Sequence, residues 1–351
     1  MPSSRTIALV RARGFGSLPD MLEAQAGEMA VLRTFESESV PLLVRSQPDT
    51  PIPLAAMMGL FSRAAHLLAD RLFGLEVGVQ MSYRAYGLWA EYGAQGETLA
   101  DGVRRIILTS AAHLTGARLE LAPDRGRRIW RFVIPRYDVS GVQHADHLLP
   151  PMLSFARQYL GPKWQPERIE VSYARDADAR LLEDRLQAPI RYGCPGTGIV
   201  LRPDELAHRR AAPARPPGRM LSLRDVDADI ALRDAPEPAR ALSAIVALRL
   251  LEGSSDIEGA ARLAGISVQS LQRRLRQKGY TYREVVDAAR RARAIGLLME
   301  SRRPLVEIAL ALGYEDQANF TRAFIRWFGQ PPSAFRRAQY PLAEQLEGTD
   351  I

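Results

Sequence analysis

Amide, hydroxyl and guanidinium side chains gather in one stretch near the end of the chain, residues 313–336, among regularly spaced aromatic residues. Phe320, Phe324 and Phe328 recur every fourth residue, which places them on one buried face of a helix. Asn and Gln can pair bidentately with adenine and Arg with guanine in the major groove, whereas other arginines hold phosphates. The polar residues on the outer faces of this predicted helix are Gln317, Asn319, Thr321, Arg322 and Arg326.

A second set with the same chemistry lies about fifty residues earlier, in SDIEGAARLAGISVQSLQRRLRQKGY. Ser267 is a typical N-cap, so the backbone donors that follow it could also face a phosphate. Ala261 and Gly265 correspond to Ala309 and Gly313 of the later stretch. The outer face of the helix that Ser267 begins would carry Gln269, Gln272, Arg273 and Arg276.

The elements around these residues predict two helix-turn-helix units. In the later stretch, residues 305–312 have helical spacing and lead into a turn at Gly313, and the next helix should end near Phe328 because Gly329 and two prolines follow. One such pattern is a weak signal, because helical hairpins in enzymes share its spacing. Two copies joined by a predicted helix over REVVDAARRARAIGLLME favour DNA binding.

The charge distribution points to the same partner. The net charge is +7, and residues 243–340 carry 16 Arg and Lys against 9 Asp and Glu, which accounts for the whole excess. A basic surface attracts phosphate backbones at long range, so nucleic acid is the first partner to consider. On charge alone, a solvated basic face is an equal alternative.

Other kinds of site have little support in the sequence. Cys194 is the single cysteine, so a disulfide within the chain or a cysteine zinc cluster is excluded. His144 and His147 have a spacing that suits two metal ligands on a helix, but no further ligands lie nearby, and a packing or surface role is favoured. CPGTG is interpreted as a turn. We therefore expect no catalytic residue, no metal and no cofactor, and we expect a cytoplasmic protein without a membrane span.

The part before the basic segment has mixed patterns that predict an α+β domain. Amphipathic helices are predicted over residues 54–73 and 98–114, and a β-hairpin turns at Pro123-Asp124-Arg125-Gly126. In HLLPPMLSFARQYLG a helix is predicted only after the two prolines. The strands suggest an antiparallel sheet covered by helices. The predicted organisation is an α+β domain over 1–206, a Pro- and Arg-rich linker over 207–242, an all-α domain over 243–340 and a tail over 341–351.

The segment LVEIALALGYEDQANFTRAFIRWFGQPPSAFR resembles the most characteristic motif of AraC/XylS-type regulators. SLQRRLRQKGYTYREVV resembles the branch of ornithine-utilisation regulators, in which an arabinose-binding-type sensor domain precedes the DNA-binding domain. GETLADGVRRI, WQPERIEVSY and APIRYGCPGTGIVLRPDEL are similar to that sensor, although Leu186 and Gln187 stand where Phe-Gly is usual. The resemblance implies that Pro332 and Phe335 close the DNA-binding domain. It also implies, for Arg290 on the connecting helix, either a structural ion pair or a DNA contact.

These observations predict a sequence-specific transcription regulator that binds double-stranded DNA and responds to a small-molecule effector. The resemblance implies that the effector is an amino acid or a related metabolite, that the first domain dimerises, and that RNA polymerase is a further partner; it does not identify pocket residues. One alternative is a constitutive regulator whose first domain serves only dimerisation. The other is an enzyme fused to a DNA-binding domain, such as an alkyl-acceptor repair protein, which the single cysteine disfavours.

Overall fold

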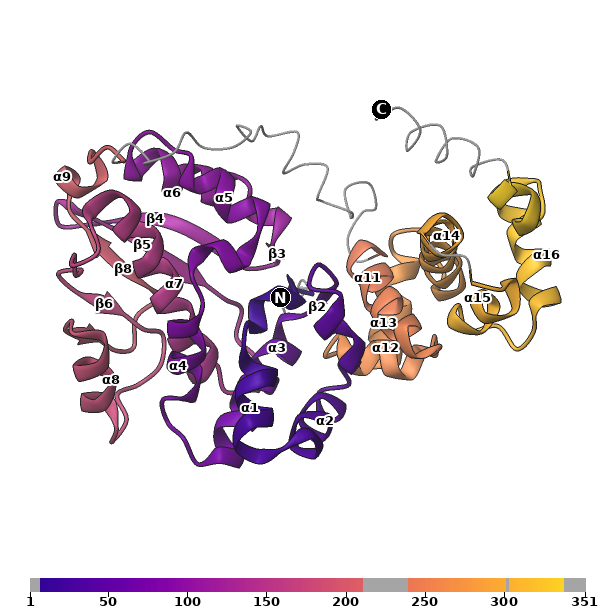
Figure 1. Ribbon diagram of the computed structural model, residues 1–351, viewed down its shortest axis with the longest axis horizontal. Helices are drawn as coiled ribbons and strands as arrows, with labels where there is room; N and C mark the ends of the chain where they lie inside the picture. The colour runs from indigo at the N-terminus through magenta and orange to yellow at the C-terminus, as the bar shows by residue number, and fades with distance from the viewer. Residues whose placement is uncertain (1–6, 211–238, 301–302, 338–351) are drawn as a thin grey trace, which may run out of the picture. The chain divides into compact units, whose positions relative to one another are not determined.

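The structure, a computed structural model, describes residues 7–210, 239–300 and 303–337 (Figure 1). The chain divides into two compact units, Met1–Arg233 and Asp234–Ile351. In the described residues the first unit combines strands with helices and the second contains helices only, which confirms the predicted fold class. The predicted linker lies mostly, and the tail wholly, outside the described residues, so the domain boundaries stay predictions.

The strands of the first unit form two sheets. A small antiparallel sheet has the order β2-β1-β3, and a larger one has the order β4-β5-β8-β6-β7, antiparallel except between β6 and β7. The strands are β1 (Leu9–Arg11), β2 (Pro51–Pro53), β3 (Leu114–Thr115), β4 (Arg118–Asp124), β5 (Arg127–Val133), β6 (Ile169–Glu170), β7 (Ile190–Arg191) and β8 (Thr197–Leu201).

The predicted hairpin is confirmed and joins β4 to β5. Asp124 pairs with Arg127, so the loop has two residues. Arg125 has φ 42° and Gly126 has φ 84°, the pair of positive values that lets a two-residue turn follow the twist of its strands.

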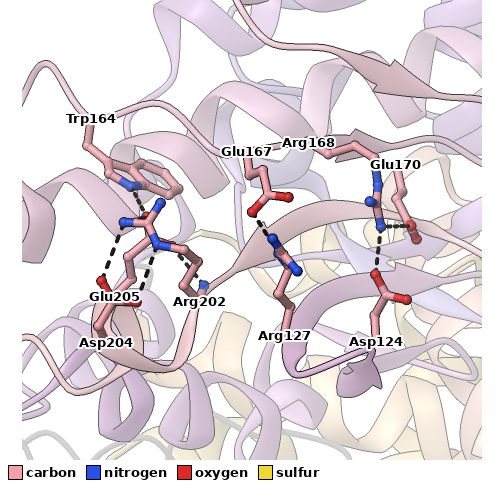
Figure 2. A network of polar contacts seen from close by, with 9 residues as sticks. All are labelled: Asp124, Arg127, Trp164, Glu167, Arg168, Glu170, Arg202, Asp204 and Glu205. Carbon is pink, nitrogen blue, oxygen red and sulfur yellow. Dashed lines mark hydrogen bonds and ion pairs between the residues drawn. The ribbon is translucent and has the colours of Figure 1, made fainter.

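Ion pairs connect the turn end of this hairpin to β6 and the residues just before it (Figure 2). Arg168, beside β6, donates to Asp124 over 2.7 Å and to Glu170 over 3.0 Å, while Arg127 pairs with Glu167 over 2.6 Å. In a separate group of contacts in the same view, the Trp164 indole donates to Glu205 over 2.8 Å. Ion pairs therefore stabilise the turn end of the hairpin in addition to the hydrogen bonds between its two strands.

The α-helices of the first unit are α1 (Leu18–Ala26), α2 (Glu28–Ser37), α3 (Leu54–Leu68), α4 (Phe73–Gln80), α5 (Leu88–Ala94), α6 (Leu99–Leu108), α7 (Val142–Leu160), α8 (Ala179–Leu186) and α9 (Pro203–Leu206). Short 3-10 helices are η1 (Ala12–Phe15), η2 (Leu42–Ser46), η3 (Tyr83–Tyr86) and η4 (Ser110–Ala112). Two of the helices are shorter than predicted. α3 ends because Ala69 takes the left-handed conformation, and α6 gives way to η4 and β3.

The prediction that a helix begins only after Pro150 and Pro151 is wrong, because α7 runs through both prolines. Pro151 has no N–H to donate to the carbonyl of His147. Gly78 of α4 lies against that carbonyl oxygen, so close that a β-carbon on Gly78 would be 2.4 Å from it. α4 packs on α7 where the hydrogen-bond ladder of α7 is interrupted, and a Cα–H of Gly78 faces the freed oxygen.

The second unit consists of α11 (Ala239–Arg249), η5 (Leu250–Glu252), α12 (Ile257–Leu263), α13 (Val268–Arg276), α14 (Tyr282–Glu300), α15 (Leu305–Ala311) and α16 (Gln317–Phe328). One buried cluster joins α14, α15 and α16 through Leu298, Ile308, Leu312, Phe320 and Phe324. Among the helices that the structure describes in either unit, none has the length and hydropathy to cross a membrane.

Candidate nucleic-acid interface and first-unit cavity

The helix α13 has the amphipathic form that the sequence predicts. The Ser267 hydroxyl caps its N-terminus by accepting from the Ser270 N–H over 3.2 Å. Leu271 and Leu275 are buried. The predicted contact residues are all exposed, and they are Ser267, Gln269, Gln272, Arg273 and Arg276.

The helix α16 is capped by Asp316, which the sequence analysis did not assign a role. Its carboxylate accepts from the Asn319 N–H over 2.6 Å and from the Asn319 side-chain amide over 2.9 Å. Arg322 in turn donates to the Asn319 side-chain oxygen over 2.6 Å. This chain of contacts fixes the orientation of two predicted DNA-binding side chains.

The opposite face of α16 is buried in aromatic contacts. Phe324 is fully buried, and its ring centroid lies 5.7 Å from that of Phe320, 4.5 Å from Phe328 and 5.4 Å from Phe335. Gly329 ends the helix with φ 70°, as predicted. Gln317, Arg322 and Arg326 are exposed, whereas Asn319 and Thr321 are half-buried.

Arg290 on α14 joins the two helix-turn-helix units. It donates to the carbonyls of Leu312 and Gly313 over 2.8 and 2.9 Å and to the Ser255 hydroxyl over 3.1 Å. Its guanidinium carbon also lies 4.4 Å from the centre of the Tyr314 ring. These contacts with carbonyl groups, a hydroxyl and a ring favour a structural role for Arg290 over a DNA contact.

A hollow of about 400 Å³ opens between α14 and α16, and basic and amide side chains form part of its lining. It brings together residues from both helices, with Asp287 beside them: Arg283, Arg290, Asn319, Arg322 and Arg326. Arg326 pairs there with Asp287 over 2.8 Å. Three of the predicted DNA-contact residues thus share one concave, basic surface.

Comparison with protein families agrees with this geometry. Residues 36–209 match the model described as the arabinose-binding domain of AraC transcription regulator, N-terminal, and residues 260–338 match a helix-turn-helix domain. The chain belongs to the AraC-type transcription regulators.

Three relatives show the extent of the similarity. The chain is 28% identical to the ornithine utilization regulator of Pseudomonas aeruginosa, over 87% of this chain and 90% of the relative. It is 25% identical to the HTH-type transcriptional regulator VirS of Mycobacterium tuberculosis, over 94% and 96%. The crystal structure of the transcriptional regulator CdpR from Pseudomonas aeruginosa matches 88% of this chain and 97% of that one, with 21% identity and a TM-score of 0.38.

This AraC-type regulator has an apolar cavity of about 80 Å³ in its first unit, which the sequence analysis missed. Its walls come from α5, α7, η3, β3, β4 and β5, among other segments. Six of its lining residues are aromatic: Tyr83, Tyr86, Trp89, Trp130, Phe132 and Phe155.

Three of the five histidines of the regulator line the same cavity, and all three are buried. His113 stacks on Trp89 with centroids 4.9 Å apart, while His144 and His147 come from one face of α7. Burial lowers the pKa of His113 to about 3 and that of His147 to about 4, and it lowers the pKa of His144 well below its usual value.

These histidines are packing and cavity residues. No group of three His, Cys, Asp or Glu side chains suited to a metal ion occurs in the part of the chain that the structure describes. The spacing of His144 and His147 indicated one helix face, but the sequence did not reveal that His113 joins them. Only the three-dimensional structure shows that all three histidines line one cavity.

Proposed function

We propose that this regulator binds specific double-stranded DNA sequences through α13 and α16 and responds to a small-molecule effector in its first unit. The observation that carries the proposal is the shared form of the two helices. Each buries an apolar stripe, through Leu271 and Leu275 or through Phe320 and Phe324, and leaves amide and guanidinium groups exposed. Such groups can read base edges or hold phosphates.

The proposed DNA contacts remain those predicted from the sequence, with the structure supporting a division of roles. Gln317 at the start of α16, and Gln269 and Gln272 on α13, are exposed amides suited to base edges. Arg326, which already pairs with a carboxylate, suits a phosphate contact in which one anion replaces another. Ser267 caps α13, so its first backbone donors are oriented toward an approaching phosphate.

The cavity supports an effector-responsive regulator over one whose first unit serves only dimerisation. Dimerisation alone does not require buried nitrogen atoms around a cavity. The enzyme alternative would need a reactive thiolate, but Cys194 is buried and its burial raises the pKa of the thiol. A homodimer, a contact with RNA polymerase and a cytoplasmic location complete the proposal.

The test is footprinting of the purified protein on the DNA upstream of its own gene, with and without metabolites from a cell extract. We expect protected sites whose occupancy changes with the metabolites. Gln317→Ala should weaken operator binding, whereas Gln330→Ala, an exposed amide just after α16, should not. Equal binding of operator and scrambled DNA would contradict sequence-specific recognition.

Effector response has its own thermodynamic test. If an effector changes operator affinity by some factor, operator DNA must change effector affinity by the same factor. Titrations in both orders on the intact chain measure the two factors. Tight effector binding without this reciprocity would rule out regulation through DNA affinity.

A further inference from the structure

The cavity in the first unit contains polar atoms that have no partner. The indole Nε1 of Trp130 and the Nδ1 atoms of His113 and His144 are buried and make no hydrogen bond within the described structure. All three side chains line the cavity and are at least nine-tenths buried. Leaving a buried polar group unpaired costs about 1–3 kcal/mol, so three around one cavity indicate an occupant that carries a polar group of its own.

The charge of the lining restricts what that occupant can be. No Asp, Glu, Lys or Arg is among the described residues that line the cavity. Burial keeps its histidines neutral at pH 7, since the pKa of each is lowered. A carboxylate or an ammonium group would lose its hydration there without gaining a counter-charge. A zwitterionic amino acid would carry both groups, so the lining favours an uncharged molecule.

The size and shape of the cavity further restrict which compound can bind there. An apolar cavity of roughly 150 Å³ can hold benzene, so a cavity of about 80 Å³ accepts a single small ring only when some of its lining side chains move. Met152 is part of the wall, and its flexible thioether can yield to a substituent. The aromatic walls offer edge and face contacts to a flat ring.

We propose that this cavity binds a neutral, monocyclic aromatic compound with a hydroxyl group, of the phenol or benzyl alcohol class. The hydroxyl oxygen accepts from the Trp130 Nε1–H, and its proton is donated to an unprotonated imidazole nitrogen of His144 or His113. The ring occupies the space between the aromatic walls. The inference rests on the proposed function only in treating such a compound as the effector; binding itself does not depend on DNA.

The first experiment uses the intact protein and three molecules of similar size at pH 7.5: benzyl alcohol, benzoate and benzylamine. We expect benzyl alcohol alone to raise the melting temperature, with a rise that grows with the logarithm of its concentration. It should also change the tryptophan fluorescence, because two of the four tryptophans line the cavity. Equal effects of the charged compounds, or no effect of benzyl alcohol, would overturn the proposal.

Variants locate the binding site. Trp130→Phe keeps a ring but removes the donor, and calorimetric titration should show benzyl alcohol affinity reduced about fivefold or more, as the loss of one hydrogen bond implies. Trp164→Phe is the matched control, since its indole donates to Glu205 outside the cavity (Figure 2). Met152→Phe should fill the cavity and abolish binding while the circular dichroism spectrum stays native. Unchanged affinity in a folded Trp130→Phe or Met152→Phe protein would refute the site.

Failure of this inference is distinguishable from failure of the proposed function. Benzyl alcohol binding without any change in operator affinity would support the cavity assignment and contradict the effector response. A metabolite that changes operator affinity while no neutral aromatic compound binds would contradict the cavity assignment and leave the effector response intact.

Discussion

Arg326 of α16 donates a hydrogen bond to Asp287 of α14 across 2.8 Å, at the edge of the basic hollow. Both side chains are partly exposed, so the pair should contribute no more than about 1 kcal/mol to stability. Asp287→Asn removes the competing carboxylate and frees the guanidinium for phosphate. We expect tighter binding to operator and scrambled DNA alike, measured by fluorescence anisotropy at several salt concentrations. Glu307→Gln, on α15, is the control for net charge, and an equal gain there would contradict the release of Arg326.

Substitutions on the two faces of α16 should have different effects, one on the stability of the second unit and the other on DNA binding. Phe324→Ala should destabilise the second unit by roughly 3–5 kcal/mol, because a fully buried ring is lost from an aromatic cluster. Arg322→Ala should leave the melting temperature nearly unchanged and weaken operator binding by roughly 1–3 kcal/mol if the side chain reads a base. Circular dichroism melting and binding to operator and scrambled DNA distinguish these results. If Arg322→Ala unfolds the second unit while Phe324→Ala leaves it stable, the assignment of the buried and exposed faces of α16 is wrong.

The contacts of Arg290 predict that lysine cannot replace it. Arg290→Lys keeps the charge but loses the planar group that reaches two carbonyls, a hydroxyl and the Tyr314 ring together. We expect a loss of roughly 2–3 kcal/mol in the free energy of unfolding of the second unit, measured by denaturant titration. Arg291→Lys, at the exposed neighbouring position, should have little effect. Similar stability of the two variants would argue against a structural role for Arg290.

The buried histidines predict acid sensitivity in the first unit. Below about pH 6.5 the unfolded chain takes up a proton at each histidine, whereas folded His147, with its pKa lowered to about 4, does not. The stabilisation is therefore complete above pH 6.5 and is lost as the pH falls toward 4. At pH 5 the loss should be about 2 kcal/mol for each such histidine.

The variant His113→Phe checks this dependence, because a ring remains to stack on Trp89 and no proton can bind. Between pH 7.5 and 5 its stability should fall less than that of the parent protein in denaturant titrations. His66→Gln alters an exposed histidine and should follow the parent. If the stability of His113→Phe falls with pH as steeply as that of the parent protein, buried His113 is not a source of the acid sensitivity.

The sequence predicted the second unit in more detail than the first, for a physical reason. The limits of α16 follow from local signals, namely the apolar period of its phenylalanines and the left-handed Gly329. The end of α8 was not predicted, because Gln187 closes it with φ 53° at the position where the resemblance expects glycine. The helix α7 runs through Pro151, and the contact of Gly78 with the carbonyl that Pro151 leaves unpaired comes from another helix, so no local signal encodes it.

The exposed residues of the candidate DNA interface could be predicted from the sequence, but their long-range partners and the cavity could not. Exposure of Gln269, Gln272 and Arg322 follows from helical periodicity, which a single segment contains. The partner of Arg326 could not be predicted, because Asp287 lies 39 residues away on a helix whose rotation the sequence does not specify. The cavity forms where several segments meet, so the sequence related His144 to His147 but not to His113.

The continuous helix α14 limits how this regulator can evolve. It spans 19 residues without a break, so the second helix-turn-helix follows the first through a rigid rod about 28 Å long. Inserting or deleting one residue in that rod would rotate everything beyond it by about 100° around the helix axis. New operator preferences should therefore arise by substitution on α13 and α16, while changes in the length of α14 should be eliminated by selection.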